Sequence, residues 1–310
     1  MKILVTGGAG FIGTNLTIMA QQRGHEVTIL DDLSTGDSRN LQAHDAQFVE
    51  GSILDRKLLD STMVATDSCI HLAALGSVPR SVADPFATHE VNALGTLNVM
   101  EAARKAEIQQ VIVASSSSVY GLNPALPKGE REWVRPMSPY AVTKLATEQY
   151  ALAYQQSYGM RSVAFRFFNV YGPYQRAGHA YAAVIPTFLD ALLKSQPLRI
   201  NGDGLQSRDF TYVGTLCEAL LRTAEARVSH PEPVNLAFGS KTSLLGLIQK
   251  MEELSGMAAV VTHGAERPGD VKHSQALNYS LLGMLPDLSA VPLTVGLRET
   301  INWMREELEL

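Results

Sequence analysis

Tyr140 and Lys144 lie four residues apart in the segment Ser-Pro-Tyr-Ala-Val-Thr-Lys. On a helix this spacing places both side chains on one face, where a protonated lysine lowers the pKa of the phenol from about 10 toward neutrality. Four serines, 115–118, follow an apolar run and can offer a hydroxyl to the same substrate oxygen. Such a set can take a proton from an alcohol while a hydride leaves its carbon. The same spacing is common on surface helices, so the pair alone is a weak signal.

A glycine-rich turn near the N-terminus strengthens this interpretation. Gly7, Gly10 and Gly13 follow a β-branched run and precede a helical pattern. There, one glycine allows a tight turn, one lets backbone N–H groups approach a pyrophosphate, and one lets the helix pack on the strand. The phosphate then lies at a helix N-terminus, which favours an anion. The turn is typical of a dinucleotide site, although any tight strand–helix turn can use glycine.

Two aspartates, Asp31 and Asp32, end the second apolar run, where dinucleotide-binding folds place a ribose-binding acid. Asp31 comes 18 residues after Gly13. Its carboxylate would accept a hydrogen bond from the adenosine 2′-OH and repel a 2′-phosphate, so NAD is expected rather than NADP. Asp32 shares this role or caps the loop. In the plainer interpretation, Asp31 is itself only a capping residue.

The composition of the 310-residue chain narrows its possible functions. Hydrophobic residues make up 45% and charged residues 18%, which is typical of a soluble globular protein with a sizeable core. The net charge of −5 gives no basic field for nucleic acid or an anionic membrane. Two cysteines and eight scattered histidines argue against a disulfide scaffold and a metal site. With no leader and no spanning apolar stretch, we expect a reduced, cytoplasmic location.

Short apolar strands alternate with helical patterns in the first half, which predicts an α/β fold with a doubly wound parallel sheet, the Rossmann fold. Pro and Gly punctuate the second half, which predicts a smaller α+β lobe. We expect an NAD-binding domain at 1–168, with a returning segment near 208–238, and a mainly substrate-binding lobe at 169–310. Strands are expected at 2–6, 26–30, 47–50, 68–72, 110–114 and 162–167, and helices up to about 23 and at 85–105, 139–158, 184–195, 212–227 and 242–255.

In this order the residues resemble the extended short-chain dehydrogenase/reductase family and, within it, the NAD-dependent nucleotide-sugar epimerases. The likeness covers essentially the whole chain and does not depend on one short pattern. The motifs that carry it are TGGAGFIG at 6–13, HLAA at 71–74, Asn92 with Gly95-Thr96, SSSSVYG at 115–121, SPYAVTK at 138–144, RFFNVYGP at 166–173, NGDGLQSRDF at 201–210 and RPGD at 267–270.

The resemblance implies a role for each matching residue. Tyr140 is the base, Lys144 holds the nicotinamide ribose and tunes Tyr140, and Ser116 assists at the substrate oxygen. NAD is expected at Gly7, Gly10, Phe11, Ile12, Gly13, Asp31, Asp32, Ser52, Ile53, Leu72, Ala73, Ala74, Asn92, Ser115, Tyr140, Lys144 and Phe167. The nucleotide sugar is expected at Ser116, Ser117, Tyr140, Asn169, Ala183, Val184, Asn201, Arg208, Arg267, Asp270 and Ser274.

Two of these substrate residues, Arg208 and Arg267, are expected to grip the diphosphate, since guanidinium groups make forked phosphate contacts. Asp270 is expected on the uridine ribose. Taken singly, each arginine would be read as half of a surface salt bridge. Two positions depart from the family pattern: Ser52 stands where an acid often reaches the adenine, and Leu277 stands where Asp is usual.

The serines after the strand hydroxyl bear on the reaction. Related dehydratases and decarboxylases carry acidic residues there, whereas this chain has Ser117 and Ser118. That difference favours 4-epimerisation of a UDP-hexose through a 4-keto sugar. Another epimerase, reductase or decarboxylase reaction on a nucleotide sugar remains an alternative. A non-catalytic nucleotide-sensing Rossmann protein is an alternative of a different class, although such proteins typically lose the Tyr or the Lys.

The sugar is indicated by Ser274, at a position where glucose-restricted relatives place a bulky Tyr. A small serine leaves room for a 2-acetamido group, so UDP-GlcNAc/UDP-GalNAc interconversion is expected, with UDP-Glc/UDP-Gal as a further pair. In the plainer interpretation Ser274 is one small loop residue. The resemblance also implies a homodimer through helices near 85–105 and 139–157, although apolar faces of such helices can also be buried within one chain.

Overall fold

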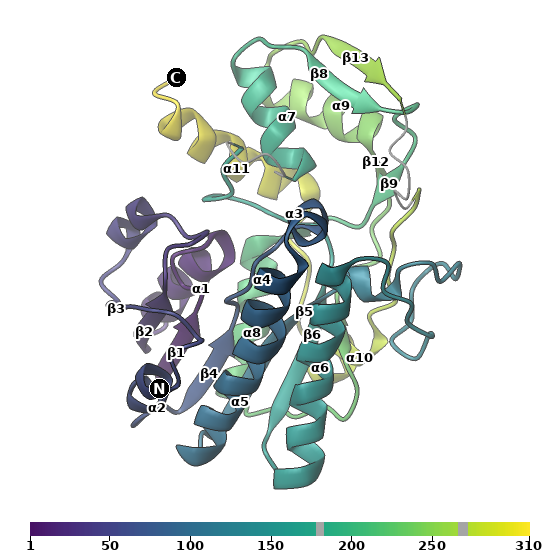
Figure 1. Ribbon diagram of the computed structural model, residues 1–310. Helices are drawn as coiled ribbons and strands as arrows, with labels where there is room; N and C mark the ends of the chain where they lie inside the picture. Colours follow the sequence, from purple (N-terminus) through teal and green to yellow (C-terminus); the bar gives the residue numbers. More distant parts are fainter. Residues whose placement is uncertain (178–182, 266–271) are drawn as a thin grey trace.

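Seven parallel strands form the central sheet of the computed structural model, which describes residues 1–177, 183–265 and 272–310 (Figure 1). Their order across the sheet is β11-β6-β5-β4-β1-β2-β3. This confirms the predicted doubly wound α/β fold, and each expected strand is present. The bounds are β1 (Lys2–Thr6), β2 (Glu26–Asp31), β3 (Gln47–Glu50), β4 (Ser68–His71), β5 (Gln110–Ser116), β6 (Ser162–Phe167) and β11 (Val234–Leu236).

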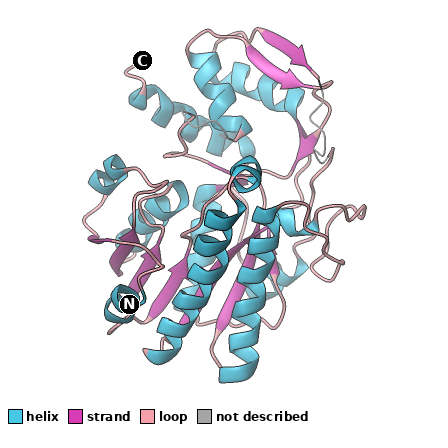
Figure 2. Ribbon diagram, in the orientation of Figure 1, coloured by secondary structure: helices cyan, strands magenta, loops and turns pink. Residues whose placement is uncertain are grey.

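Helices cover both faces of the sheet (Figures 1 and 2). On one face α5 packs against α2 and α6, and on the other α1 packs against α8. Most of the strand side chains between these layers are fully buried, so the layers share one apolar core on each face of the sheet. The bounds are α1 (Phe11–Gln22), η1 (Ser38–Ala43), α2 (Arg56–Thr62), α3 (Val78–Ala83), α4 (Pro85–His89), η2 (Glu90–Leu94), α5 (Gly95–Lys105), η3 (Ser117–Tyr120), α6 (Pro139–Tyr158) and α8 (Val213–Glu225).

Helix α6, which carries Tyr140 and Lys144, has sharply defined ends. Ser138 accepts a hydrogen bond from the backbone N–H of Ala141, and Pro139 opens the first turn, where its missing N–H costs nothing. Gly159 closes the helix in the left-handed conformation. Local sequence alone therefore sets the helix boundaries predicted at 139 and 158.

The expected helix at 85–105 is not continuous. It divides into α4, the π-helical turn η2 and α5. Within the turn, the Asn92 side-chain amide binds the backbone N–H and C=O of Leu75 at 2.7 and 3.1 Å. Single π turns within helices are rare and frequently lie at functional sites. Here the turn brings Asn92 to the chain segment that follows β4.

A smaller lobe stands above the sheet in Figure 1 and contains most of the second half of the chain. Helix α11, near the C-terminus, packs there against α7 and α9 and was not predicted from the sequence. No helix among the described residues is both long and apolar enough to cross a membrane. The remaining elements of the second half are β7 (Val170–Tyr171), α7 (Val184–Leu193), β8 (Leu198–Asn201), β9 (Ser207–Arg208), β10 (Thr211–Tyr212), β12 (Thr242–Ser243), α9 (Leu244–Ser255), β13 (Val261–Gly264) and α11 (Leu293–Glu307), together with α10 (Tyr279–Met284), which packs on β11 of the central sheet.

The chain returns from this lobe to the sheet. Helix α8 packs on α1 and β5, and β11 pairs in parallel with β6. The strand order reverses between β1 and β4, which are direct neighbours in the sheet. In open α/β sheets the crevice at such a reversal is the usual ligand site. The topology therefore directs attention to the carboxyl ends of β1 and β4.

Candidate active site

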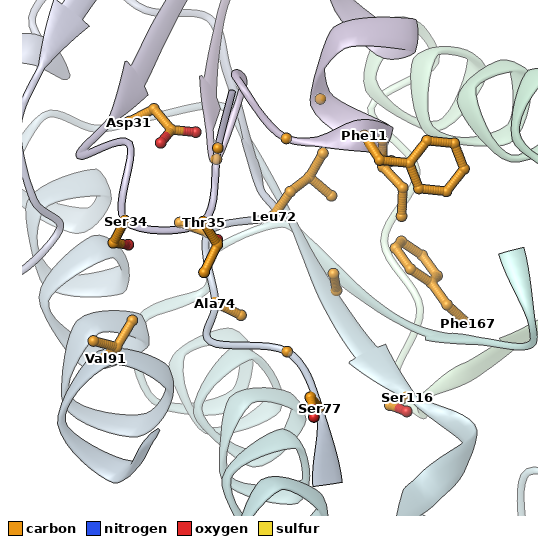
Figure 3. A pocket seen from close by; sticks show the side chains of 18 of the residues that line it. Phe11, Asp31, Ser34, Thr35, Leu72, Ala74, Ser77, Val91, Ser116 and Phe167 are labelled. Carbon is orange, nitrogen blue, oxygen red and sulfur yellow. The ribbon is translucent and has the colours of Figure 1, made fainter. Parts of the chain in front are cut away.

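A cavity of about 590 Å³ opens at this edge of the sheet, where the parallel strands end (Figure 3). It brings together most of the residues that the sequence predicts for the cofactor and the chemistry. In Figure 3, Asp31 and Ser116 lie at opposite ends of the view, with the Phe11 and Phe167 rings close together at one side. The predicted residues that line it are Gly7, Gly10, Phe11, Ile12, Gly13, Asp31, Asp32, Ile53, Leu72, Ala73, Ala74, Ser115, Ser116, Tyr140, Lys144, Phe167, Asn169 and Ala183.

The glycine turn packs too closely to admit side chains. Gly7 has φ +75, and a Cβ placed on it would lie 2.6 Å from the backbone nitrogen of Ala73. A Cβ on Gly13 would lie 2.3 Å from the carbonyl oxygen of Gly7. Gly10, the N-cap of α1, makes no side-chain cap. The first N–H groups of α1 therefore border the cavity without a competing side chain, as a pyrophosphate site requires.

Asp31 is held in place at the far end of the cavity. Its carboxylate accepts hydrogen bonds from the backbone N–H groups of Ala9 and Leu33 at 3.0 and 2.8 Å. Burial raises the pKa of this carboxyl, while the two N–H groups act in the opposite direction. A fixed acceptor beside an open helix N-terminus matches the ribose and the phosphates of NAD, so the residues present fit this cofactor.

The predicted proton-transfer residues meet at the other end. Lys144 is buried, and its Nζ donates to the carbonyl oxygen of Ala114 at 2.8 Å and lies 6.0 Å from the centre of the Tyr140 ring. Ser116 makes a side-chain hydrogen bond with Tyr140 that lowers the pKa of the phenol. Burial has the larger effect and leaves the pKa of Tyr140 raised. The expected depression of this pKa is therefore not found in this structure.

The same burial acts on the lysine, whose pKa falls to about 8 because the charged form loses solvation. Lys144 is still largely protonated at neutral pH. Its positive charge can therefore favour the phenolate form of Tyr140, which is the form that accepts a proton. With its pKa raised, Tyr140 rests as the neutral phenol, and Lys144 and Ser116 are the neighbours placed to favour its phenolate.

A buried polar network lies directly behind these groups. Glu148 and Arg166 form a two-point ion pair at 2.7 and 3.0 Å, with 0% and 3% of their side chains exposed. Ser115 donates to the Glu148 carboxylate at 2.9 Å and to the backbone oxygen of Lys144 at 3.2 Å. The network joins β5, β6 and α6. It therefore fixes the helix that carries Tyr140 against the strand that carries Ser116.

A second cavity of about 310 Å³ lies in the smaller lobe. Its wall includes five residues predicted for the substrate: Asn169, Ala183, Val184, Asn201 and Arg208. The Arg208 guanidinium also donates to the backbone oxygens of Ser207 and Lys272. The two cavities share the lining residues Asn169, Val170, Gln175 and Ala183. A ligand in the second cavity can therefore extend toward the groups of the first.

Several predicted site residues lie elsewhere. Asn92 is buried and uses its amide on Leu75 and on Thr143, 3.0 Å away. Ser274 donates its backbone N–H to Ser207 at 3.0 Å and is not part of either cavity wall. Neither wall includes Ser52 or Ser117. Arg267 and Asp270 lie outside the described residues, so their roles stay predictions.

Among the lining residues that were not predicted, two polar ones have side chains that a ligand could use. Gln175 belongs to both walls, and its Oε1 is buried without a hydrogen-bond partner among the described residues. Arg80, on α3, lines the first cavity and makes no ion pair within the described part of the chain. Gln175 closely follows the RFFNVYGP motif, so its position in the sequence could have indicated that it belongs to the site. Arg80 follows no such motif as closely, so its sequence position gives no comparable indication.

The chain matches the NAD dependent epimerase/dehydratase family over residues 3–237. It is 36% identical over 313 residues to the UDP-glucose 4-epimerase of Mycolicibacterium smegmatis, with 99% of each chain covered. Among solved structures, UDP-N-acetylglucosamine 4-epimerase from Methanobrevibacter ruminantium M1, in complex with UDP-N-acetylmuramic acid, superimposes with a TM-score of 0.92 at 36% identity and covers 99% and 98% of the chains. UDP-glucose 4-epimerase of Thermus thermophilus in complex with NAD gives 0.87 at 33% identity, covering 98% and 99%.

The protein thus belongs to the NAD-dependent epimerase/dehydratase family, a group of extended short-chain dehydrogenases/reductases. Within that family its relatives and structural neighbours place it with the isomerases. The expected cofactor, NAD, is confirmed by the family and its neighbours.

Proposed function

We propose that the protein interconverts the C4 epimers of a UDP-sugar, with UDP-GlcNAc/UDP-GalNAc as the principal pair and UDP-Glc/UDP-Gal as a second. The observation that carries this proposal is the junction of the two cavities. Tyr140, Lys144 and Ser116 line the first cavity, and Arg208 lines the second. Solved neighbours that are UDP-N-acetylglucosamine and UDP-glucose 4-epimerases support both sugar classes.

In the proposed mechanism, the phenolate form of Tyr140 takes the proton of the C4 hydroxyl and becomes the neutral phenol, and Ser116 holds the same oxygen. NAD held in the first cavity, between the glycine turn and Lys144, would supply the acceptor and the donor for the C4 hydride. Lys144, held by the Ala114 carbonyl, stabilises the phenolate while it exists. After the 4-keto sugar turns about its diphosphate linkage, Tyr140 gives the proton back. Atoms and electrons balance over the cycle, so no external oxidant or reductant is consumed.

The diphosphate is proposed to lie in the second cavity, beside Arg208. A guanidinium there supplies forked, charge-assisted hydrogen bonds to phosphate oxygens. Asn169, which lines both cavities and donates its amide to the Asp209 backbone at 3.1 Å, borders the path to the sugar. Gln175 Oε1, which has no hydrogen-bond partner within residues 1–177, 183–265 and 272–310, can accept a hydrogen bond from a sugar hydroxyl or acetamido N–H at the junction. We therefore expect the sugar to cross the junction and the uridine to lie in the second cavity.

The test uses purified protein without added cofactor. It is incubated separately with UDP-GlcNAc and with UDP-glucose, and the C4 epimers are resolved chromatographically. Conversion of UDP-GlcNAc supports the proposal and shows that NAD is retained. Conversion of UDP-glucose alone keeps the mechanism and rejects the principal substrate. No conversion of either, even after NAD is supplied, rejects the reaction.

A decarboxylase or dehydratase activity is the competing reaction within the family. Ser117 and Ser118 begin η3, where related enzymes carry acids, and neither serine is a general acid or base at neutral pH. The same chromatographic assay separates the reactions, because decarboxylation of UDP-glucuronate shortens the sugar by one carbon and dehydration removes water. An unchanged product mass identifies an epimerase.

Exposed apolar side chains on α4, η2 and α6 support the proposed homodimer. Phe86, Leu94 and Val142 are 85%, 43% and 52% exposed, which leaves an apolar area that a second copy would cover. Light scattering coupled to size exclusion should give a dimer, and Phe86→Glu should shift it toward the monomer. A monomeric wild type at micromolar concentration rejects the assembly.

A further inference from the structure

Arg176 lies at the edge of the first cavity, in the loop that leads from β7 toward the second cavity. Its guanidinium binds two segments that are distant in the sequence. Nη1 donates to Asn40 Oδ1 at 2.6 Å and lies 3.0 Å from Asp37 Oδ2. Nη2 and Nε donate to the Glu307 carboxylate at 2.9 and 3.1 Å. Only 17% of the side chain is exposed, so these contacts use most of the guanidinium's donors.

The partner Asn40 continues the contact to the glycine turn. It is buried, and its Nδ2 donates to the carbonyl oxygen of Ala9 at 2.9 Å. The backbone N–H of Asp37 donates to the same carbonyl at 3.1 Å. From the other side, Asn15 on α1 donates to the carbonyl oxygen of Pro173 at 2.9 Å. The glycine turn, the segment after β2 and the loop after β7 are therefore one hydrogen-bonded unit.

The C-terminal helix α11 makes further contacts with Arg176. Besides Glu307, α11 contributes Trp303, whose ring centre lies 5.6 Å from the Arg176 guanidinium, within reach of a cation–π interaction. The Tyr174 ring packs against the same indole at 5.6 Å. Because α11 packs on α7 and α9, this contact connects the smaller lobe to the edge of the cofactor cavity.

These bonds lie beside the cavity and connect segments that contribute to its wall. Ser34, Thr35 and Gly36 line it on one side, and Gln175 and Arg176 line it on another. The Arg176 contacts with Asp37 and Asn40 join these two walls beside the glycine turn. A dinucleotide that left the cavity between these two walls would have to separate them and break several charge-assisted hydrogen bonds.

We propose that Arg176, with Asn40, Asp37 and Glu307, forms a latch that retains NAD by joining the walls of its cavity and tying them to the C-terminal helix. The inference rests on the proposed placement of NAD in this cavity. Arg176 acts here as a positioning residue, outside the proton-transfer chemistry. An enzyme whose cofactor is regenerated in each cycle benefits from such retention, since exchange with free nucleotide is not needed.

Arg39 offers a matched control. It forms ion pairs with Asp37 at 2.7 Å and with Glu307 at 2.9 Å, but it is 60% exposed and does not line the cavity. Its removal takes a positive charge from the same cluster and leaves the connection between the walls in place. If Arg176 is a latch, its removal should accelerate NAD release far more than removal of Arg39. If the two arginines act only through their charge, both substitutions should have similar effects on release.

The experiment measures bound NAD in wild type, Arg176→Ala, Glu307→Gln and Arg39→Ala. Each protein is gel-filtered and its NAD content determined by enzymatic cycling. Release is then followed after dilution into buffer containing an NAD glycohydrolase, well below the unfolding temperature. Arg176→Ala should release NAD at least about tenfold faster than wild type, which corresponds to about 1.4 kcal/mol. Glu307→Gln should accelerate release about threefold, and Arg39→Ala less than about twofold.

Saturating added NAD should restore the kcat of Arg176→Ala, which separates loss of retention from loss of folding. If Arg176→Ala does not fold, Glu307→Gln decides, because it removes only the charge on the α11 side. Release from both variants at the wild-type rate overturns the latch. Equal acceleration by Arg39→Ala and Arg176→Ala overturns it as well. A wild type that neither contains nor binds NAD overturns the proposed function together with the latch, whereas the first two outcomes leave that function intact.

Discussion

The two cavities differ in how the chain builds them. The first lies where parallel strands end, and backbone groups and small residues from short motifs form much of its wall. The second is assembled from residues of α7, β8, β9 and the start of α9, which come together only in the folded lobe. A buried ion pair supports the first cavity from behind. The contrast predicts that changes behind the first cavity act on stability or on all turnover, whereas changes around the second act on substrate selectivity.

The largest expected effect is in the first cavity. Tyr140→Phe removes the hydroxyl proposed to carry the proton, so kcat should fall by about 10²- to 10⁴-fold. The thermal unfolding midpoint should stay close to that of the wild type. Steady-state kinetics with UDP-GlcNAc and circular dichroism give the two readouts. Tyr150→Phe, on the same helix α6, is the matched control and should keep near wild-type turnover. A Tyr140→Phe enzyme that remains active removes the proposed mechanism.

Behind the first cavity, Glu148→Gln should lower stability by about 3–5 kcal/mol, because it leaves the Arg166 charge buried without its partner. Chemical denaturation measures the change. The exposed pair of Lys105 and Asp60, 3.1 Å apart with 43% and 44% of the side chains exposed, provides the comparison. Asp60→Asn should cost at most about 1 kcal/mol. Equal effects of the two substitutions would show that the buried network does not distinguish the first region.

The sequence predicts the two regions unequally, and the reason is physical. Elements with local signals are recovered closely: Ser138, Pro139 and Gly159 delimit α6, and the glycine turn lies where β1 ends. Contacts between distant segments leave no such pattern. Arg176 joins residues near 40 and 307, and Arg80 reaches the cavity through the placement of α3.

Burial explains why the prediction of a lowered pKa for Tyr140 was wrong. Helical spacing predicts that Lys144 lowers the pKa of Tyr140, but enclosure of both groups raises the pKa of Tyr140 and lowers that of Lys144 to about 8. Enclosure depends on the packing of β5, β6 and the loops around them. The residues of a motif can therefore be predicted from sequence more readily than the energetics of their surroundings.

A smaller effect, the pH dependence of stability, should further distinguish the region around the first cavity from that around the second. His71 is buried beneath the glycine turn, with its ring nitrogens 2.7 and 3.0 Å from the hydroxyls of Thr6 and Thr96. Burial, with a further contribution from Lys144, lowers the pKa of His71 to about 3 in the folded protein from 6.5. Between these values the unfolded chain binds more protons. Stability should therefore fall as pH drops below about 6.5, by about 1.4 kcal/mol per pH unit for this group.

Denaturant titrations at pH values from neutral to mildly acidic measure this slope. His71→Gln removes the titrating group while keeping polar atoms beside the two threonines, so its stability should depend less on pH over the same range. An identical pH dependence in both proteins would show that His71 does not carry the effect. The second cavity contains no comparable buried histidine among the residues that form its described wall.

The smallest expected change tests the substrate side. Ser274 hydrogen-bonds through its backbone to Ser207, the residue before Arg208. A tyrosine there would place a large side chain near the strand that carries Arg208, the arginine proposed to bind the diphosphate. Ser274→Tyr should lower kcat/KM for UDP-GlcNAc by about 10- to 100-fold, or about 1–3 kcal/mol, while changing that for UDP-glucose by less than about threefold. Ser274→Ala, which adds no bulk, is the matched control and should leave the ratio unchanged. Equal losses on both sugars would mean that the position disturbs the lobe as a whole, and the division between a stability-determining and a selectivity-determining cavity would fail at this point.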